Sequence, residues 1–271
     1  MTRSDLAVGE ILDDAGDLVA AVLAPWAAVL WLSAIPLRLA QAHFAGRVAG
    51  LGEEAHAYGD HLQVLAVGVG AALLLSLWGR AVFVRACVLR LRTLESSGAA
   101  PLRLRLGPFA AYVYAALAIE ALFYATCVSA VTVPVLVLVA GLAAATLPLL
   151  EGPGLLRPFR HIAASSRRMG PLTGLLAVFG AAWLLAMANL YVAFQAGLWL
   201  ADGVIGLDLP RWQGLLSAGN LRFFFMLVTG GWLLVEPWWL AALVIYVHRL
   251  RSQASGEDLK LWFNRLRSAE P

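Results

Sequence analysis

The chain has 271 residues, of which 61% are hydrophobic and only 14% are charged. Soluble domains are nearer half apolar and a quarter charged, so one soluble core cannot hide this much apolar surface and we expect lipid around the chain. The net charge of +3 is small, and Lys260 is the single lysine. Because a nucleic-acid-binding protein needs a clustered basic face, we expect no nucleic-acid partner.

Residues 1–17 carry an amphipathic helical pattern that continues to Val19. Apolar side chains share one helical face and acidic side chains the other, which predicts an amphipathic cytoplasmic helix before the first membrane crossing. A cleavable signal peptide begins with positive charge, so we expect this acidic segment to be retained. The apolar set is Val8, Ile11, Leu12, Ala15, Leu18 and Val19, and the acidic set is Glu10, Asp13, Asp14 and Asp17.

Apolar stretches of about 20 residues, the length that a helix needs to cross a hydrocarbon layer, then recur along the chain. The stretch 108–150 is about twice that length and is interrupted only by Glu120, so it predicts a hairpin of two crossings, bent near Thr132 to Pro134. We therefore expect an all-α, polytopic membrane helical bundle of about six transmembrane helices within residues 18–247. The remaining crossings are predicted at residues 18–39, 62–84, 172–200 and 223–247.

The tail, residues 248–271, follows the last crossing. Its apolar residues share one helical face, which predicts a second amphipathic segment on the cytoplasmic surface of the membrane. Most of the ten tryptophans fall toward the predicted helix ends, as interfacial belts do. The apolar residues of the tail are Leu259, Trp262, Phe263 and Leu266.

The twenty Lys and Arg residues are divided unevenly between the two sides of a six-crossing arrangement. One side holds only Arg38, Arg47, Arg211 and Arg222, so sixteen fall on the other side, among them Arg80 at the flank of the second crossing. Positively charged connections are retained in the cytoplasm. This split predicts that both termini lie in the cytoplasm.

Three segments, in order along the chain, resemble a family of bacterial six-helix membrane proteins. Residues 6–13, LAVGEILD, resemble the family's L-x-V-G-E-I-L-D opening, and residues 151–170 resemble its cytoplasmic E-G-x-G...L-R-x-S...G stretch. Arg251 with residues 256–259, GEDL, resembles its R-x-R-x-E-G-x-D-L tail. The family is named for the membrane domain of glycerophosphoryl diester phosphodiesterase. The resemblance implies a six-helix protein of the bacterial cytoplasmic (inner) membrane, without the catalytic domain to which such a region is sometimes fused.

The resemblance also implies protein partners. Members of the family look like accessory partners of AAA-type ATPases and transglutaminase-like membrane proteins. The tail departs from the family pattern at Arg249, Gln253 and Ser255. The candidates for partner docking or for lipid headgroup contact are Glu10, Asp13, Glu151, Arg160, Arg167, Arg168, Arg251 and Asp258.

Two carboxylates fall near mid-depth of predicted crossings, where an ionisable group is costly and usually faces a partner, a cavity or a pathway. Glu120 lies in the third crossing and Glu236 in the sixth. Together they could relay protons or bind a cation, or each could be protonated and bonded to a neighbouring helix. Asn189 and Gln195 in the fifth crossing could line a polar path or bond across helices.

Motifs of catalysis are missing from the sequence. It contains no Gly-rich phosphate loop, no G-x-S-x-G elbow, no H-E-x-x-H and no C-x-x-C. Residues 53–61 contain a single Glu-x-x-His, at Glu53 and His56, which favours a solvated loop over a metal site. We therefore expect no catalytic residue, no cofactor and no metal.

Two functional hypotheses follow from these patterns. The leading one is a non-catalytic accessory or scaffold component that docks partners through its basic cytoplasmic connections and amphipathic ends. The alternative is a small transporter, or an ion- or proton-conducting protein, that uses Glu120 and Glu236. Carboxylates near the midplane of interrupted helices are how many transporters hold ions.

Overall fold

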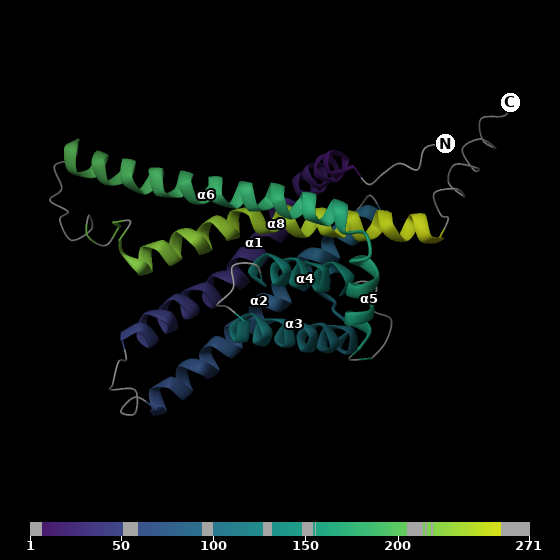
Figure 1. The fold of residues 1–271 in the computed structure, drawn as a ribbon, viewed down its shortest axis with the longest axis horizontal. Coiled ribbons are helices and arrows are strands. Elements are labelled where there is room, and N and C mark those ends of the chain that lie inside the picture. The colour runs from purple at the N-terminus through teal and green to yellow at the C-terminus, as the bar shows by residue number, and fades with distance from the viewer. Residues whose placement is uncertain are drawn as a thin grey trace. The chain divides into compact units, whose positions relative to one another are not determined.

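The fold is helical throughout the part of the chain that the computed structural model describes (Figure 1). The described residues are 7–50, 59–93, 100–126, 132–147, 156–204 and 219–255, with 154, 214, 216 and 217. For these residues the all-α prediction is confirmed. The helices are α1 (Val8–Gly50), α2 (Gly59–Thr93), the short 3-10 helix η2 (Ala100–Leu102), α3 (Leu106–Thr126), α4 (Thr132–Thr146), α5 (Arg157–Ser165), α6 (Met169–Gly203) and α8 (Leu221–Ser255).

Three helices are long and apolar enough to cross a membrane. The candidate spans are Ala66–Leu91 in α2, Met169–Gly203 in α6 and Phe223–Gln253 in α8. The segments Val8–Val22 and Trp26–Ala40 of α1 add a fourth if they form one span. The fold is therefore compatible with a membrane protein, and the six-crossing arrangement stays a prediction.

The predicted hairpin of the third and fourth crossings corresponds to α3 and α4, which are shorter. α4 has 15 residues and so rises about 22 Å, less than a hydrocarbon layer of roughly 30 Å. The bend predicted near Thr132 to Pro134 is the first turn of α4, where proline is tolerated because the first N–H groups of a helix have no intrahelical partner. Residues 127–131 lie outside the described part of the chain.

The exposed surface of α6 explains why this helix suits lipid. Only 11% of its apolar span is buried. Large apolar side chains are exposed along its length, with exposed fractions of 59% to 71% at Leu184, Leu185, Val192 and Trp199. Continuous apolar surface of this kind is unfavourable in water and favourable against lipid tails.

The chain divides into two compact units. Unit 1 comprises Met1–Ala24, Ala81–Leu176 and Trp238–Pro271, and unit 2 comprises Pro25–Arg80 and Ala177–Pro237. α1, α2, α6 and α8 each contribute to both units, whereas α3, α4 and α5 belong to unit 1.

In unit 1, α3, α4 and α5 pack on one another (Figure 1). α5 was not expected from the sequence, which we interpreted as a basic connection over residues 151–171. Its nine residues form an amphipathic helix that buries Pro158 and Ile162. α4 also approaches α8 closely, because a Cβ atom at Gly141 would lie 2.4 Å from Leu243 and 2.6 Å from Trp239.

The start of α1 confirms the amphipathic pattern predicted for it. The apolar positions point into unit 1 and the acidic positions stay in solvent, as a helix with two distinct faces requires. The buried side chains include Ile11, Ala15, Leu18 and Val19, and the exposed ones are Glu10, Asp13, Asp14 and Asp17.

In unit 2, helices approach each other at glycine positions. A Cβ atom on Gly79 of α2 would lie 1.7 Å from Ser33 Oγ of α1, and one on Gly231 of α8 would lie 2.8 Å from Met187 Cγ of α6. Trp183 Nε1 of α6 also donates a hydrogen bond to the carbonyl of Val228, at 2.9 Å. Small residues at such contacts let helix backbones come close, which is how helices associate in lipid.

Candidate functional site

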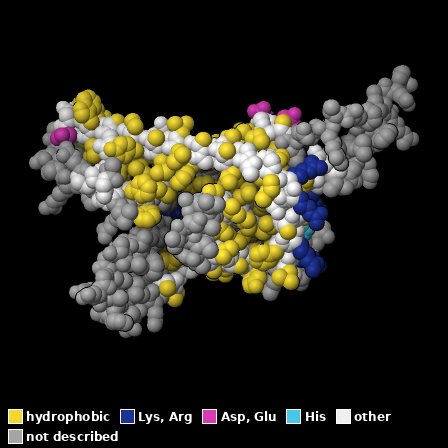
Figure 2. All heavy atoms as spheres, in the orientation of Figure 1, with side chains coloured by type: hydrophobic (Ala, Val, Ile, Leu, Met, Phe, Trp, Pro, Cys, Tyr) yellow, Lys and Arg dark blue, Asp and Glu magenta, His cyan; other side chains and the backbone are white. Residues whose placement is uncertain are grey.

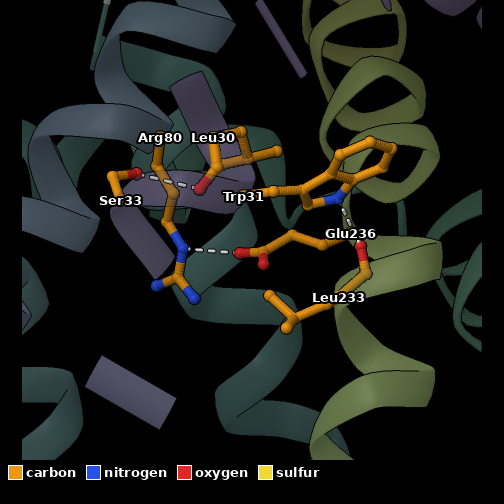
Figure 3. Close-up of polar contacts among 6 residues, drawn as sticks. All are labelled: Leu30, Trp31, Ser33, Arg80, Leu233 and Glu236. Atoms are coloured by element: carbon orange, nitrogen blue, oxygen red, sulfur yellow. Dashed lines mark hydrogen bonds and ion pairs between the residues drawn. The ribbon is translucent and has the colours of Figure 1, made fainter. Parts of the chain in front are cut away.

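Glu236 of α8 forms a buried ion pair with Arg80 of α2 in unit 2 (Figure 3). Arg80 Nε donates a hydrogen bond to Glu236 Oε1 at 2.6 Å. The Arg80 and Glu236 side chains are 13% and 2% exposed. Pairing with an opposite charge is the usual way in which an ionisable residue is accommodated among apolar helices. Glu236 therefore has its partner on another helix, far away in the sequence.

Pro237 changes the main-chain hydrogen bonding of α8 beside this pair. Proline has no N–H, so the carbonyl of Leu233, four residues earlier, loses its usual donor within the helix. Trp31 of α1 replaces that donor, because its Nε1 donates to the Leu233 carbonyl at 2.8 Å (Figure 3). An unpaired buried carbonyl would cost about 1–3 kcal/mol. The indole thus stabilises α8 where the proline interrupts it.

Some buried polar atoms of unit 2 keep unused hydrogen-bonding capacity. In the part of the chain that the structure describes, Glu236 Oε2 and Ser76 Oγ have no hydrogen-bond partner. Ser76 lies four residues before Arg80, so the hydroxyl and the guanidinium share one face of α2. Ser33, by contrast, donates to the Leu30 carbonyl at 2.8 Å.

The other polar residues predicted within crossings do not join this cluster. Glu120 is half-buried on α3 in unit 1, whereas Glu236 belongs to unit 2. Asn189 is exposed on α6. Gln195 Nε2 donates to the Leu216 carbonyl at 2.8 Å. Of these predicted residues, Glu236 is the one that the structure places in a buried polar site.

A second candidate site lies on unit 1, where α5 presents arginines outward. The apolar side of α5 packs against α3 and α4. Figure 2 shows Lys and Arg side chains gathered over α5, beside the apolar surface of its neighbours. The sequence contains no Asp or Glu between Gly152 and Ala201 that could neutralise them locally. We define the basic surface as the exposed side chains of Arg157, Arg160, Arg167, Arg168 and Arg251.

The charges of the basic surface affect the pKa of His161 in α5. Its pKa is lowered from 6.5, first by burial and then by the charges of Arg251 and Arg157. Burial and neighbouring cations both disfavour the charged imidazolium. The effect shows that an arginine near the end of α8 acts on the same region as the arginines of α5.

Hydrogen bonds fasten the turn after α5 to α8. The hydroxyl of Tyr246 donates to the Ser165 carbonyl at 2.7 Å, and Arg168 Nη1 donates to Gln253 Oε1 at 2.7 Å. Gln253 is one of the positions at which the tail departs from the family pattern. These bonds hold the backbone that carries the basic surface.

Arg249, a second departure from the family pattern, pairs with the start of α1. It donates to Glu10 Oε2 at 3.0 Å and also pairs with Asp14. Glu10, predicted as a docking residue, is thus engaged within the chain itself, while Asp13 is exposed. Glu151 and Asp258 lie outside the described residues.

Sequence reasoning did not connect Arg80 with Glu236, because Arg80 was counted with the cytoplasmic flank of its crossing. The available signal was that opposite charges occur inside two otherwise apolar stretches, where pairing is expected. The tryptophans as a group predict interfacial belts, and that pattern does not reveal that Trp31 donates a hydrogen bond to the Leu233 carbonyl.

Comparison with known proteins identifies no relative. No family model matches the sequence, and neither a curated protein nor a solved structure matches it. The family resemblance of the three sequence segments therefore stays a prediction.

Proposed function

We propose that this chain is a non-catalytic, multi-pass component of a bacterial cytoplasmic membrane that docks an acidic partner protein on its basic surface. It crosses the membrane six times, with both termini in the cytoplasm. The observation that carries the proposal is the outward display of arginines on α5, a helix whose apolar side is already buried within unit 1.

The burial of α5 favours a protein partner over a lipid one. An amphipathic helix that binds a bilayer inserts its apolar face among the lipids. In α5 that face is occupied, since Pro158 and Ile162 are buried. The exposed face offers guanidinium groups, which match carboxylates through two parallel hydrogen bonds. An acidic segment of a partner protein provides such carboxylates.

The test is capture of the partner from membranes by the full-length chain. Two double variants are compared with the wild type: Arg157→Glu with Arg160→Glu, and Arg157→Lys with Arg160→Lys. We expect the wild type to retain a partner that carries an acidic segment and the glutamate variant to lose it, because that variant reverses the charge. The lysine variant should retain the partner more weakly than the wild type, because an ammonium group keeps the charge but cannot form the two parallel hydrogen bonds.

Reconstitution separates a protein partner from lipid. The purified partner should still bind the wild-type chain in vesicles made only of zwitterionic lipid. Equal recovery by all three forms of the chain would overturn the proposal, as would binding that appears only when anionic lipid is added.

The six-crossing topology is tested separately by cysteine labelling in a background without the native cysteines. A cysteine at Ser97 should react only from the cytoplasmic side, and one at Ala57 only from the opposite side. Labelling of both positions from the same side would contradict the six-crossing arrangement. The docking proposal is tested independently, by the capture and reconstitution experiments.

A second candidate function, ion binding or transport, is favoured by one observation. Glu236 Oε2 is buried within α8 and has no hydrogen-bond partner in the described structure. We expect Glu236→Gln to abolish ion flux in reconstituted vesicles and Glu120→Gln, which changes the other unit, to leave it unchanged. Flux that survives Glu236→Gln would count against this candidate.

A further inference from the structure

Asn189 of α6 exposes an amide group at a depth where lipid would surround it. It lies three residues past the middle of the candidate span Met169–Gly203, which is about 5 Å along the helix axis. A hydrocarbon layer extends about 15 Å to either side of its middle. The side chain of Asn189 is exposed, and it forms no hydrogen bond with the described part of the chain. The amide would therefore face lipid tails.

An unpaired amide is unfavourable in hydrocarbon, because no water is present to exchange hydrogen bonds with it. Asparagine and glutamine within a crossing therefore usually bond to a neighbouring helix or segment. Gln195 of the same helix does so inside the chain, where it donates to the Leu216 carbonyl. The partner that Asn189 needs has to come from outside unit 2.

α6 turns its opposite side to α8. A Cβ atom on Gly231 of α8 would lie 2.8 Å from Met187 Cγ, and Trp183 donates to the Val228 carbonyl of α8. Successive residues of an α-helix are about 100° apart, so Asn189, two residues after Met187, points about 160° away from it. The amide is thus directed away from the helix on which α6 packs.

Small residues beside Asn189 leave room for the backbone of another helix. Ala193 and Gly197 follow it at intervals of about one turn, and both are exposed. A Cβ atom on Gly197 would meet nothing within 4 Å. Small residues four positions apart let two helices approach closely in a membrane. We define the amide ridge as Asn189, Ala193 and Gly197.

We propose that α6 of one copy pairs with α6 of a second copy along the amide ridge, with reciprocal hydrogen bonds between the two Asn189 side chains. An amide is complementary to itself in charge, because its NH2 group donates and its oxygen accepts. A two-fold axis along the membrane normal brings the same residue of both copies together. Positively charged connections give every copy one orientation, so Asn189 lies at the same depth in each.

The pairing rests on the membrane crossing of α6 in the proposed function and is independent of the basic surface. A foreign helix would need its own polar group at this depth, whereas a second copy carries one at the matching position. Lipid alone offers the amide no partner in the hydrocarbon layer. A second copy is therefore the occupant that these observations favour.

The experiment measures energy transfer between full-length chains in vesicles. The native cysteines are replaced, and a donor or an acceptor dye is attached to a cysteine at Ser97. We expect transfer that falls as added lipid dilutes the protein, as a reversible dimer requires. Asn189→Leu should raise the dissociation constant of the dimer about threefold to thirtyfold for each hydrogen bond lost.

Two further measurements separate pairing from a structural role. Asn189→Gln keeps an amide and should retain most of the energy transfer. At high lipid dilution, Asn189→Leu should unfold at the same denaturant concentration as the wild type, because the side chain is exposed in the single chain. Unchanged stability together with weaker association assigns the effect to the contact between copies.

Cysteine crosslinking locates the contact on α6. Ala193→Cys lies on the amide ridge and should give disulfide-linked dimers after mild oxidation. Leu184→Cys is the matched control, because Leu184 is 59% exposed and lies about 140° around the helix from Asn189. It should give few such dimers in the same vesicles.

Three outcomes would overturn the inference: no energy transfer at any ratio of protein to lipid, equal transfer by the wild type and Asn189→Leu, or crosslinking at Leu184 rather than at Ala193. The double variant Arg157→Glu with Arg160→Glu should dimerise as the wild type does. Absence of the dimer while the topology labelling holds removes the pairing alone. Loss of capture while the dimer persists concerns the basic surface, so the two failures are distinguishable.

Discussion

Replacing Trp31 by phenylalanine should destabilise the fold mainly because it removes one hydrogen bond. Trp31 Nε1 donates to the Leu233 carbonyl at 2.8 Å, and Pro237 deprives that carbonyl of its main-chain donor. Unpaired buried carbonyls cost about 1–3 kcal/mol, and hydrogen bonds between membrane helices measure about 0.6–2 kcal/mol. We therefore expect Trp31→Phe to lower the free energy of unfolding by about 1–2 kcal/mol beyond the effect of the smaller ring.

A second tryptophan of unit 2 provides the matched control. Trp183 Nε1 donates to the Val228 carbonyl at 2.9 Å, and the residue four positions later, Trp232, keeps its N–H. Trp183→Phe loses the same ring volume and leaves no carbonyl without a main-chain donor. It should therefore cost less than Trp31→Phe when unfolding is followed in micelles with increasing denaturant.

A double-mutant cycle with Pro237→Ala isolates the hydrogen bond. Alanine at this position returns a main-chain N–H to the Leu233 carbonyl. In the Pro237→Ala background, Trp31→Phe should therefore lower the free energy of unfolding by less, and the difference should be most of the expected value of about 1–2 kcal/mol. Independent effects add to within about 0.5 kcal/mol, so a difference of this size is measurable. Equal costs of Trp31→Phe and Trp183→Phe would refute the reasoning, and so would a cost of Trp31→Phe that Pro237→Ala leaves unchanged.

Three further predictions concern helix packing and charge. Gly79→Ala should destabilise the fold by about 1–3 kcal/mol because its Cβ would meet a neighbouring serine, while Gly70→Ala, with open space in the same helix, should be neutral or slightly stabilising in the same unfolding assay. Arg249→Gln should lower the free energy of unfolding by less than about 1 kcal/mol, because the two carboxylate partners of Arg249 are more than half exposed, and added salt should abolish the difference. A larger loss that does not depend on salt would contradict this. The pKa of His161, measured by NMR, should lie below 6.5 and rise toward it in Arg251→Gln. The folded state binds the proton of His161 less tightly than the unfolded state does. The neutral imidazole therefore contributes to the free energy of unfolding above pH 6.5, and this contribution is lost as the pH falls below 6.5. A His161 pKa that Arg251→Gln does not move would contradict the assigned cause.

The helices themselves were predictable because their signals are local. At the start of α1, apolar and acidic residues alternate with helical spacing, and the structure buries Ile11 and Ala15 while exposing Glu10 and Asp13. α5 was missed because its pattern occupies only nine residues, within a stretch whose arginines and prolines are also typical of a connection. Short amphipathic segments carry too few turns for periodicity to identify them.

The polar site was only half predictable. The cost of a carboxylate among apolar residues singles out Glu236 without any knowledge of the fold. The same reasoning singled out Glu120, which the structure leaves half-buried in the other unit. How deeply a residue is buried depends on which helices surround it, and the spacing of residues along the sequence does not identify those helices.

The chain's composition and periodicity thus determine a helical, lipid-compatible protein with costly charges at known positions, because residue type and spacing act over a few turns. Tertiary packing alone decides that Arg80 meets Glu236, that Trp31 supplies the hydrogen bond that Pro237 removes, and that Arg251 joins the arginines of α5. The residues of the first two contacts are far apart in sequence, and only the close approach of whole helices, at residues as small as Gly79, brings them within bonding distance.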